Sequence, residues 1–144
     1  MFKPFVLLSA ASLFVLSPAL IQAGSPQDAA PAPAPSHAGA PNPVKPTAET
    51  QAKAKGLYEI DCAMCHGDSG NGQTDLAKSM SLSMVDFTDA KSMSSKTDGD
   101  LFDIIRNGKD KMPPESSGRA NDTMVWSLIH YIRKMGGSQA AAAK

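Results

Sequence analysis

The sequence holds two cysteines three positions apart, with a histidine directly after the second, in the segment Cys62-Ala63-Met64-Cys65-His66. Two thiols about one helical turn apart can reach the two vinyl groups of a porphyrin, and the next imidazole then lies beneath its iron. This C-x-x-C-H pattern is the signature of covalent haem attachment. The motif predicts one haem c, with Cys62 and Cys65 as the attachment points and His66 as an iron ligand.

Three other uses of these residues are open to the chain. A structural disulfide between Cys62 and Cys65 would leave the position of His66 unexplained. A thioredoxin-like dithiol would need a preceding strand in a βαβ pattern, which the sequence lacks. A zinc site would need more ligands, and only His37 and His130 remain to supply them.

The stretch that contains the motif has little apolar material for a core. A domain of about 90 residues with so few large apolar side chains usually needs a disulfide or a bound group to fold stably. The large aromatic side chains of this stretch are Tyr58, Phe87, Phe102, Trp126 and Tyr131. A covalently bound haem would supply the missing apolar bulk.

Hydrophobic periodicity predicts three main helices, over residues 49–62, 98–107 and 122–135. Gly108 is a stop signal for the second helix, and Asn121 is a candidate N-cap for the third. The intervening stretches are rich in glycine and serine and are predicted to be loops. No strand-like alternation of useful length occurs. The sequence therefore predicts an all-α domain, with three main helices and loops wrapped around one haem.

The beginning of the chain has the layout of a secretory signal peptide, with Lys3 followed by an apolar run and then by small residues. Cleavage after Ala23 is expected, and Ala19 offers a competing site. Retention of residues 1–23 as an uncleaved membrane tether is the alternative. The protein is therefore expected in the periplasm, or on the outer face of the cytoplasmic membrane if the segment is retained.

Residues 24–48 are rich in proline and alanine and have almost no large apolar side chains. Such a segment is predicted to be a semi-rigid linker with much polyproline II structure. His37 lies within it and is expected to be a solvated linker residue. The folded domain is expected over residues 49–136, and residues 137–144 form an alanine-rich tail that is expected to fray.

Charge gives little information about partners. The sequence has 14 basic and 14 acidic residues, without a basic tract or interleaved basic and aromatic residues. Nucleic acid is therefore not an expected partner. A local charged patch can still steer docking to a redox protein despite a neutral total. A monomer is expected.

Met112 is the candidate for the second axial ligand of the iron. A thioether is a soft, neutral ligand that raises the reduction potential relative to a second histidine. Pro113 and Pro114 stiffen the backbone next to it, which favours a weak iron–sulfur bond. Core packing is the alternative use of this methionine. Four other methionines compete in principle: Met80, Met84, Met93 and Met124.

Residues 49–136 resemble the small bacterial class I c-type cytochromes, of the monohaem periplasmic type. The resemblance implies a cytochrome c fold with His66 and Met112 as axial ligands. It also implies that the first and last helices cross almost at right angles, where Ala54 and Tyr58 meet Leu128 and Tyr131. The matching positions are Tyr58, the motif from Cys62 to His66, Gly108, Met112-Pro113-Pro114, Leu128 and Tyr131-Ile132-Arg133.

The chain departs from this family at two points. Ala54 stands where the family often has glycine, which would hold the two helices slightly further apart. The loop after His66 lacks the usual proline, so the sequence does not assign the carbonyl that accepts the Nδ1 proton of that histidine.

A few residues outside the motifs have weaker assignments. Arg106 and Arg119 are expected to be solvated surface charges, with a haem propionate as the alternative partner. Trp126 is expected either in the core or against the haem. Phe87 and Phe102 are expected to wall the haem pocket. His130 is expected on the surface.

Protein ligands on both sides of the iron would leave no open position for a substrate. The expected function is therefore one-electron transfer without catalysis. Its partners would be a donor dehydrogenase or membrane complex, and an acceptor oxidase or reductase. The alternatives are a membrane-tethered electron-transfer subunit of a respiratory or dehydrogenase complex, and a haem enzyme or ligand sensor with a labile Met112.

Overall fold

The computed structural model describes residues 36–137, which belong to the compact unit Pro33–Lys144. The predicted signal peptide, the first part of the predicted linker and nearly all of the predicted tail lie outside the described residues. Within the described part, no helix is both long and apolar enough to cross a membrane.

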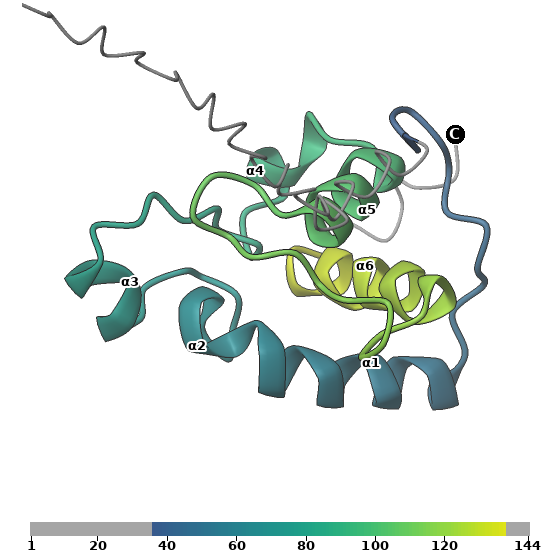
Figure 1. Ribbon diagram of the computed structural model, residues 1–144, viewed down its shortest axis with the longest axis horizontal. Coiled ribbons are helices and arrows are strands. Elements are labelled where there is room, and N and C mark those ends of the chain that lie inside the picture. Colours follow the sequence, from purple (N-terminus) through teal and green to yellow (C-terminus); the bar gives the residue numbers. More distant parts are fainter. Residues whose placement is uncertain (1–35, 138–144) are drawn as a thin grey trace, which may run out of the picture. The chain divides into compact units, whose positions relative to one another are not determined.

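The described residues form an all-α domain, as predicted (Figure 1). Between residues 36 and 137 there is no β-strand; the β-type pairing in this range is an isolated antiparallel bridge between Lys109 and Met112. The helices follow one another as α1 (Ala48–Asp61), α2 (Ala63–His66), α3 (Asp75–Ser79), α4 (Ala90–Ser94), α5 (Asp98–Asn107) and α6 (Asp122–Met135).

The three long helices α1, α5 and α6 confirm the three predicted ones to within a residue at each end. Local capping explains where they start. The Thr47 side chain caps α1 in a capping box with Thr50, and Thr97 caps α5 in the same way with Asp100. At α6, the side chain of Asn121 accepts from the backbone N–H of Met124, so the predicted N-cap is confirmed.

The three short helices lie in stretches that were predicted to be loops. Helix α2 is a single turn that continues from α1 after a break at Cys62. Helices α3 and α4 each begin at a polar cap, Thr74 and Asp89 respectively. One turn of helix is too short to show a hydrophobic period, which is why the sequence pattern does not reveal these elements.

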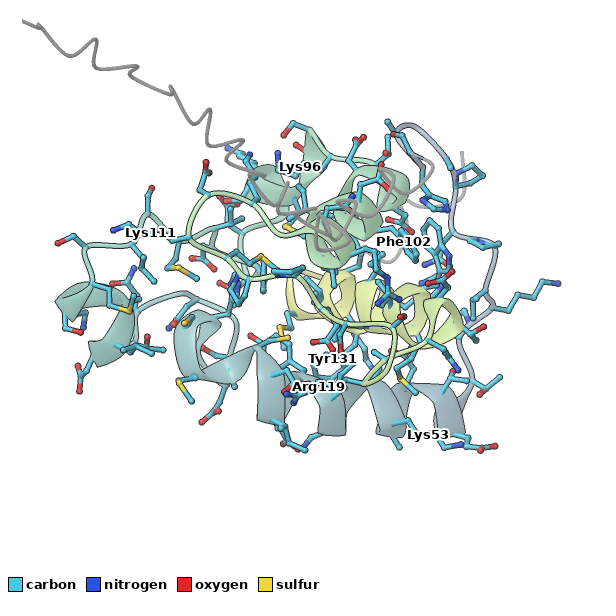
Figure 2. The ribbon with its side chains drawn as sticks, in the orientation of Figure 1. Lys53, Lys96, Phe102, Lys111, Arg119 and Tyr131 are labelled. Atoms are coloured by element: carbon cyan, nitrogen blue, oxygen red, sulfur yellow. The ribbon has the colours of Figure 1, made fainter. Side chains whose placement is uncertain are left out.

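The core is built around α6, which packs most extensively against α1 and next most against α5 (Figure 1). Ala54 and Tyr58 of α1 are fully buried, and Leu128 of α6 is almost so. The rings of Tyr58 and Tyr131 pack with their centroids 5.4 Å apart, and Tyr131 lies between α6 and α1 (Figure 2). The residues expected at the meeting point of the first and last helices are therefore brought together.

The segment 36–47 is not a free linker. In Figure 1 it runs as a dark blue stretch of chain from beside α5, past α6, to the start of α1. The prediction that His37 is a solvated linker residue is wrong. Its ring packs on Phe102 at 4.3 Å and edge-on against Trp126 at 5.7 Å, and its Nδ1 donates to Asp103 across 3.0 Å.

We call residues 36–47 the N-terminal strap, because further contacts hold it along α5 and α6. The Asn42 side chain donates to the Trp126 carbonyl, and Val44 packs against the core. His130, expected on the surface, is half-buried and donates from Nε2 to the Val44 carbonyl across 2.6 Å. Val44 is the one large apolar residue between positions 24 and 47, and it is the sequence signal that marks this packing.

Candidate haem-binding site

The predicted attachment motif forms the junction of α1 and α2. Cys62 is both the C-cap of α1 and the N-cap of α2, with φ −116° and ψ −39°. Its amide donates to the Tyr58 carbonyl, and its carbonyl accepts from the amide of His66 across 2.9 Å. One turn of helix therefore separates Cys62 from His66, as the attachment chemistry requires.

Both cysteines are half-buried free thiols. Burial raises the pKa of the Cys62 thiol to about 12, and the nearby carboxylates of Asp61 and Glu115 add to the effect. A redox-active dithiol needs a thiolate near neutral pH, which a raised pKa opposes. The surroundings of Cys62 therefore do not favour a thioredoxin-like use of the pair.

His66 has the properties of a metal-binding imidazole. Burial lowers its pKa, which keeps the ring neutral and leaves a lone pair for coordination. The ring stacks on Phe87, with centroids 4.6 Å apart and 17° between the planes, which places Phe87 beside the predicted ligand. The Nδ1 atom is buried and has no hydrogen-bond partner among the described residues.

Hydrogen bonds hold the backbone on both sides of His66. The buried Tyr58 hydroxyl donates to the Gly67 carbonyl across 2.7 Å. The His66 carbonyl accepts from the amide of Gly72, and the Thr74 hydroxyl donates to the Cys65 carbonyl. These contacts fix the direction in which the imidazole leaves its helix.

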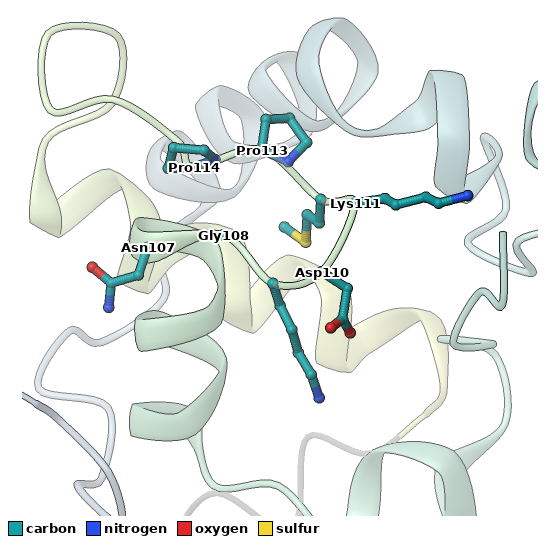
Figure 3. A pocket seen from close by; sticks show the side chains of 8 residues that line it. Asn107, Gly108, Asp110, Lys111, Pro113 and Pro114 are labelled. Atoms are coloured by element: carbon teal, nitrogen blue, oxygen red, sulfur yellow. The ribbon is translucent and has the colours of Figure 1, made fainter. Parts of the chain in front are cut away.

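Met112 lies in the loop that connects α5 to α6. The loop turns back on itself through two backbone hydrogen bonds between Lys109 and Met112, of 3.0 and 2.8 Å. Gly108 has φ +76°, and a Cβ atom there would lie 2.6 Å from the Met112 carbonyl oxygen. Residues 107–114 line a pocket of about 360 Å³, with Pro113 and Pro114 on one side and Asp110 on the other (Figure 3).

Met112 is half-buried and packs against the core, as Cys62 also does. The competing methionines have other surroundings. Met93 is fully packed in the core at 2% exposure, Met80 is 47% exposed, and Met124 packs from α6. Met112 alone combines partial burial with a backbone held by its own turn and by two prolines, so it stays the predicted second ligand.

The expectation that Arg106 is a solvated surface charge is wrong. Its side chain is 12% exposed and bonds to the loop that follows Met112. Arg119 is 59% exposed and pairs with Asp61, so the expectation for it holds (Figure 2).

Phe102 packs on Trp126, with centroids 4.4 Å apart, under the strap. The sequence did not suggest this cluster, because its third ring, His37, lies in a segment without hydrophobic periodicity.

The residues present fit a covalently bound haem. Two thiols and a neutral imidazole lie on one turn, and the buried Nδ1 atom of that imidazole has no partner within the described residues. A loop with a methionine, held by its own hydrogen bonds, follows α5. The all-α fold and this motif define the class of the protein: it is a c-type cytochrome domain, the class that carries electrons by means of a covalent haem c.

The chain belongs to the family described as cytochrome c oxidase, cbb3-type, subunit III, whose model matches residues 49–132. It is 30% identical over 87 residues to the cbb3-type cytochrome c oxidase subunit CcoP of Azospirillum brasilense, which covers 60% of this chain and 29% of that protein. It is also 27% identical over 93 residues to the cbb3-type cytochrome c oxidase subunit FixP of Azorhizobium caulinodans. That match covers 63% of this chain and 30% of FixP. The chain thus spans under a third of the length of these relatives.

Two solved structures share the fold. The KustC0563 c-type cytochrome matches with a TM-score of 0.50 and 26% identity, over 57% of this chain and 95% of that one. The reducing HAO-like protein complex Kustc0457/Kustc0458 of Kuenenia stuttgartiensis matches with a TM-score of 0.54 and 25% identity, over 65% of this chain and 46% of that one.

Proposed function

We propose that this protein transfers single electrons through one haem c, attached at Cys62 and Cys65, with His66 and Met112 as axial ligands. The observation that carries the proposal is the arrangement around His66. The two thiols lie on the turn that ends in this histidine, and the imidazole is neutral, half-buried and stacked on Phe87.

The haem iron, when bound, supplies a couple that gains or loses one electron. The residues of the chain favour electron transfer because their positions are fixed and need not change when the iron is oxidised or reduced. His66 is fixed between the Phe87 ring and the hydrogen-bonded backbone at Gly67. Met112 offers a soft, neutral sulfur, which favours the reduced state. With His66 and Met112 both bound to the iron, no position would remain open for a substrate, so the protein is proposed to act as a carrier and not as an enzyme.

The test begins with the protein produced in a host that attaches haem to such motifs. We expect the product to carry one haem per chain, and substitution of both cysteines by alanine to abolish covalent attachment. The oxidised protein should show the far-red sulfur-to-iron absorption band. Met112→Ala should lose this band and lower the reduction potential, whereas the control Met80→Ala, at an exposed methionine, should keep both. A wild-type protein without haem would refute the proposal.

The same measurements separate this function from a haem enzyme or ligand sensor with a labile methionine. Such a protein would lack the far-red band at neutral pH, or its reduced form would bind carbon monoxide or nitric oxide with a change in the haem spectrum. A far-red band in the oxidised protein, together with an unchanged spectrum of the reduced protein under these gases, would support the carrier.

A second candidate, an electron-transfer subunit of a larger complex, is favoured by the relatives. CcoP and FixP are named as subunits of cbb3-type oxidases, and one solved relative is part of a multi-protein complex. The redox partners of this chain would then be other subunits and not diffusing proteins. Purification in mild detergent, followed by identification of any bound oxidoreductase, distinguishes the two cases.

Export to the periplasm is part of the proposal, supported by the signal-like beginning of the sequence. A mature N-terminus near Gly24 or Leu20 would indicate a cleaved signal peptide. An intact start at Met1 in a membrane fraction would instead indicate a tether on the outer face of the membrane. N-terminal sequencing of the purified protein measures this directly.

A further inference from the structure

The guanidinium of Arg106 joins the last turn of α5 to the far end of the loop that carries Met112. Its Nη1 donates to the Glu115 carbonyl across 2.8 Å, and its Nη2 donates to the Ala120 carbonyl across 3.0 Å. The same Nη2 also donates to the carboxylate of Asp122, at the start of α6. One side chain therefore bridges the loop and both of the helices that the loop connects.

The surroundings of Arg106 keep this bridge in place. The side chain is 12% exposed, and its guanidinium lies over the ring of Phe102, 5.7 Å from the centroid. Arginine presents several donors in one rigid plane, so it can bond to two carbonyls at once, which lysine cannot do with the same geometry. Its bonds to the two carbonyls are partly buried, and hydrogen bonds gain strength as water is excluded from around them.

The backbone adds a second connection at the same place. The amide of Glu115 donates to the Ile105 carbonyl across 2.8 Å. This bond satisfies one of the last carbonyls of α5, which lack a partner inside the helix. Residues 105 and 106 thus hold the loop directly after Met112-Pro113-Pro114, where the chain would have to move if Met112 were to swing away.

We propose that Arg106 is a positioning residue that keeps the Met112 loop closed and so holds the thioether in its axial place. This inference rests on the proposed function, because it assumes that Met112 is the second ligand. Arg106 does not touch the haem; it acts through the loop backbone. Its loss increases the population of the open loop, and an outside ligand then competes more easily for the iron.

The experiment is a titration of the oxidised, haem-loaded protein with imidazole, followed through loss of the far-red sulfur-to-iron band. We expect Arg106→Lys and Arg106→Met to bind imidazole about tenfold more tightly than wild type, since losing about 1.4 kcal/mol of loop closure changes the competing equilibrium by that factor. Arg106→Lys retains the charge and the apolar stem, so it separates the two-carbonyl bridge from simple charge or packing.

Lys109→Gln is the matched control, because it removes another positive charge close to Met112, from an exposed side chain that bonds to no described residue. We expect it to bind imidazole as wild type does. Amide hydrogen exchange at Glu115 should become faster in the Arg106 variants and remain unchanged in the control, which reports loop opening independently of the haem.

The possible results separate the two proposals. A normal far-red band in wild type, with unchanged imidazole affinity in both Arg106 variants, would overturn the inference and leave the proposed ligands intact. An equal gain in affinity for Lys109→Gln would also overturn it, because the effect would then follow from charge near the loop and not from the Arg106 bridge. A wild-type protein without the far-red band would remove Met112 as a ligand, and this inference with it.

Discussion

Gly99, at the start of α5, lies directly against the carbonyl oxygen of His37: a Cβ atom on Gly99 would be 1.8 Å from that oxygen and 2.8 Å from the amide nitrogen of Ala40. The amide of Gly99 also donates to the Ala40 carbonyl across 3.0 Å. The N-terminal strap therefore lies on α5 at a place where the helix has no side chain. This close approach adds to the side-chain contacts that hold the strap on the helical domain.

Gly99→Ala should consequently displace the strap. An alanine inside a helix ordinarily stabilises it by about 1 kcal/mol relative to glycine. Here the clash with the strap backbone should outweigh that gain and destabilise the protein by about 1–3 kcal/mol. The free energy of unfolding in denaturant measures the effect.

Gly56→Ala in α1 is the matched control, because a Cβ atom there meets nothing within 4 Å. That variant should be more stable than wild type by about 0.5–1 kcal/mol. Equal stabilisation by both substitutions would contradict the packing of the strap on α5.

Asp103 should make the attachment of the strap dependent on pH. Burial would raise the pKa of this carboxyl, but hydrogen bonds from the His37 amide, the His37 ring and the Ser36 hydroxyl outweigh burial and lower it. A carboxyl whose pKa is lowered on folding contributes stability above its ordinary value of about 3.9, and this contribution is lost as the pH falls through the lowered value. The strap should therefore stay bound at neutral pH and be released only in strong acid.

Asp103→Asn should weaken the strap already at neutral pH, by about 2 kcal/mol, because it replaces hydrogen bonds to a charged acceptor. Hydrogen exchange at the Gly99 amide reports strap release. We expect faster exchange in Asp103→Asn at pH 7 and a flatter response to acid than in wild type. An acid response that is identical in the variant would show that another group controls the strap.

The long helices could be predicted from the sequence because residues close to their ends mark where they begin and end. Helix α6 combines an apolar stripe with the Asn121 cap, and α5 ends at Gly108, whose positive φ suits glycine. The attachment motif was equally readable, since its residues lie within one turn of each other. Local signals of this kind act over a few residues and depend little on the rest of the fold.

The strap and the Arg106 bridge could not be predicted in the same way. His37 and Asp103 lie 66 positions apart, and neither residue carries a local sign of its partner. The proline-rich composition around His37 favoured a solvated linker, but packing against Phe102 and Trp126 overrode that preference. In the sequence, Arg106 resembles any charged residue on the surface of a helix. Only the folded chain brings the carbonyls of Glu115 and Ala120 within hydrogen-bond distance of its side chain.

Arg133 and Asp98 form a buried ion pair that should be among the most sensitive positions of the domain. Their side chains are 6% and 2% exposed, with Nε and Oδ1 3.0 Å apart. Arg133 also donates to the carbonyls of Met93 and Lys96, and so connects α6 to α4 and to the chain between α4 and α5. Arg133→Met should cost about 3–5 kcal/mol, because it leaves a buried carboxylate without its partner.

Thermal and denaturant unfolding of the haem-loaded protein measure this cost. Lys134→Met, at the exposed neighbouring position, serves as the control and should change stability by less than about 0.5 kcal/mol. A loss below about 1 kcal/mol for Arg133→Met would mean that Asp98 finds another partner.

Tyr58→Phe tests whether the end of the attachment turn is held from α1. Burial raises the pKa of Tyr58, so its hydroxyl stays protonated and donates to the Gly67 carbonyl. Removal of the hydroxyl should cost only about 1 kcal/mol, because this carbonyl also accepts from the Gly70 amide across 3.0 Å. The more informative change is local: Gly67 directly follows His66, so the imidazole should lose part of its fixed orientation.

Tyr131→Phe is the control, since its ring packs on Tyr58 at 5.4 Å and its hydroxyl bonds to no described residue. We expect the reduction potential and the spectrum of the haem to shift in Tyr58→Phe and to stay unchanged in Tyr131→Phe; equal shifts in both variants would indicate ring packing, and not the hydrogen bond to Gly67, as the cause.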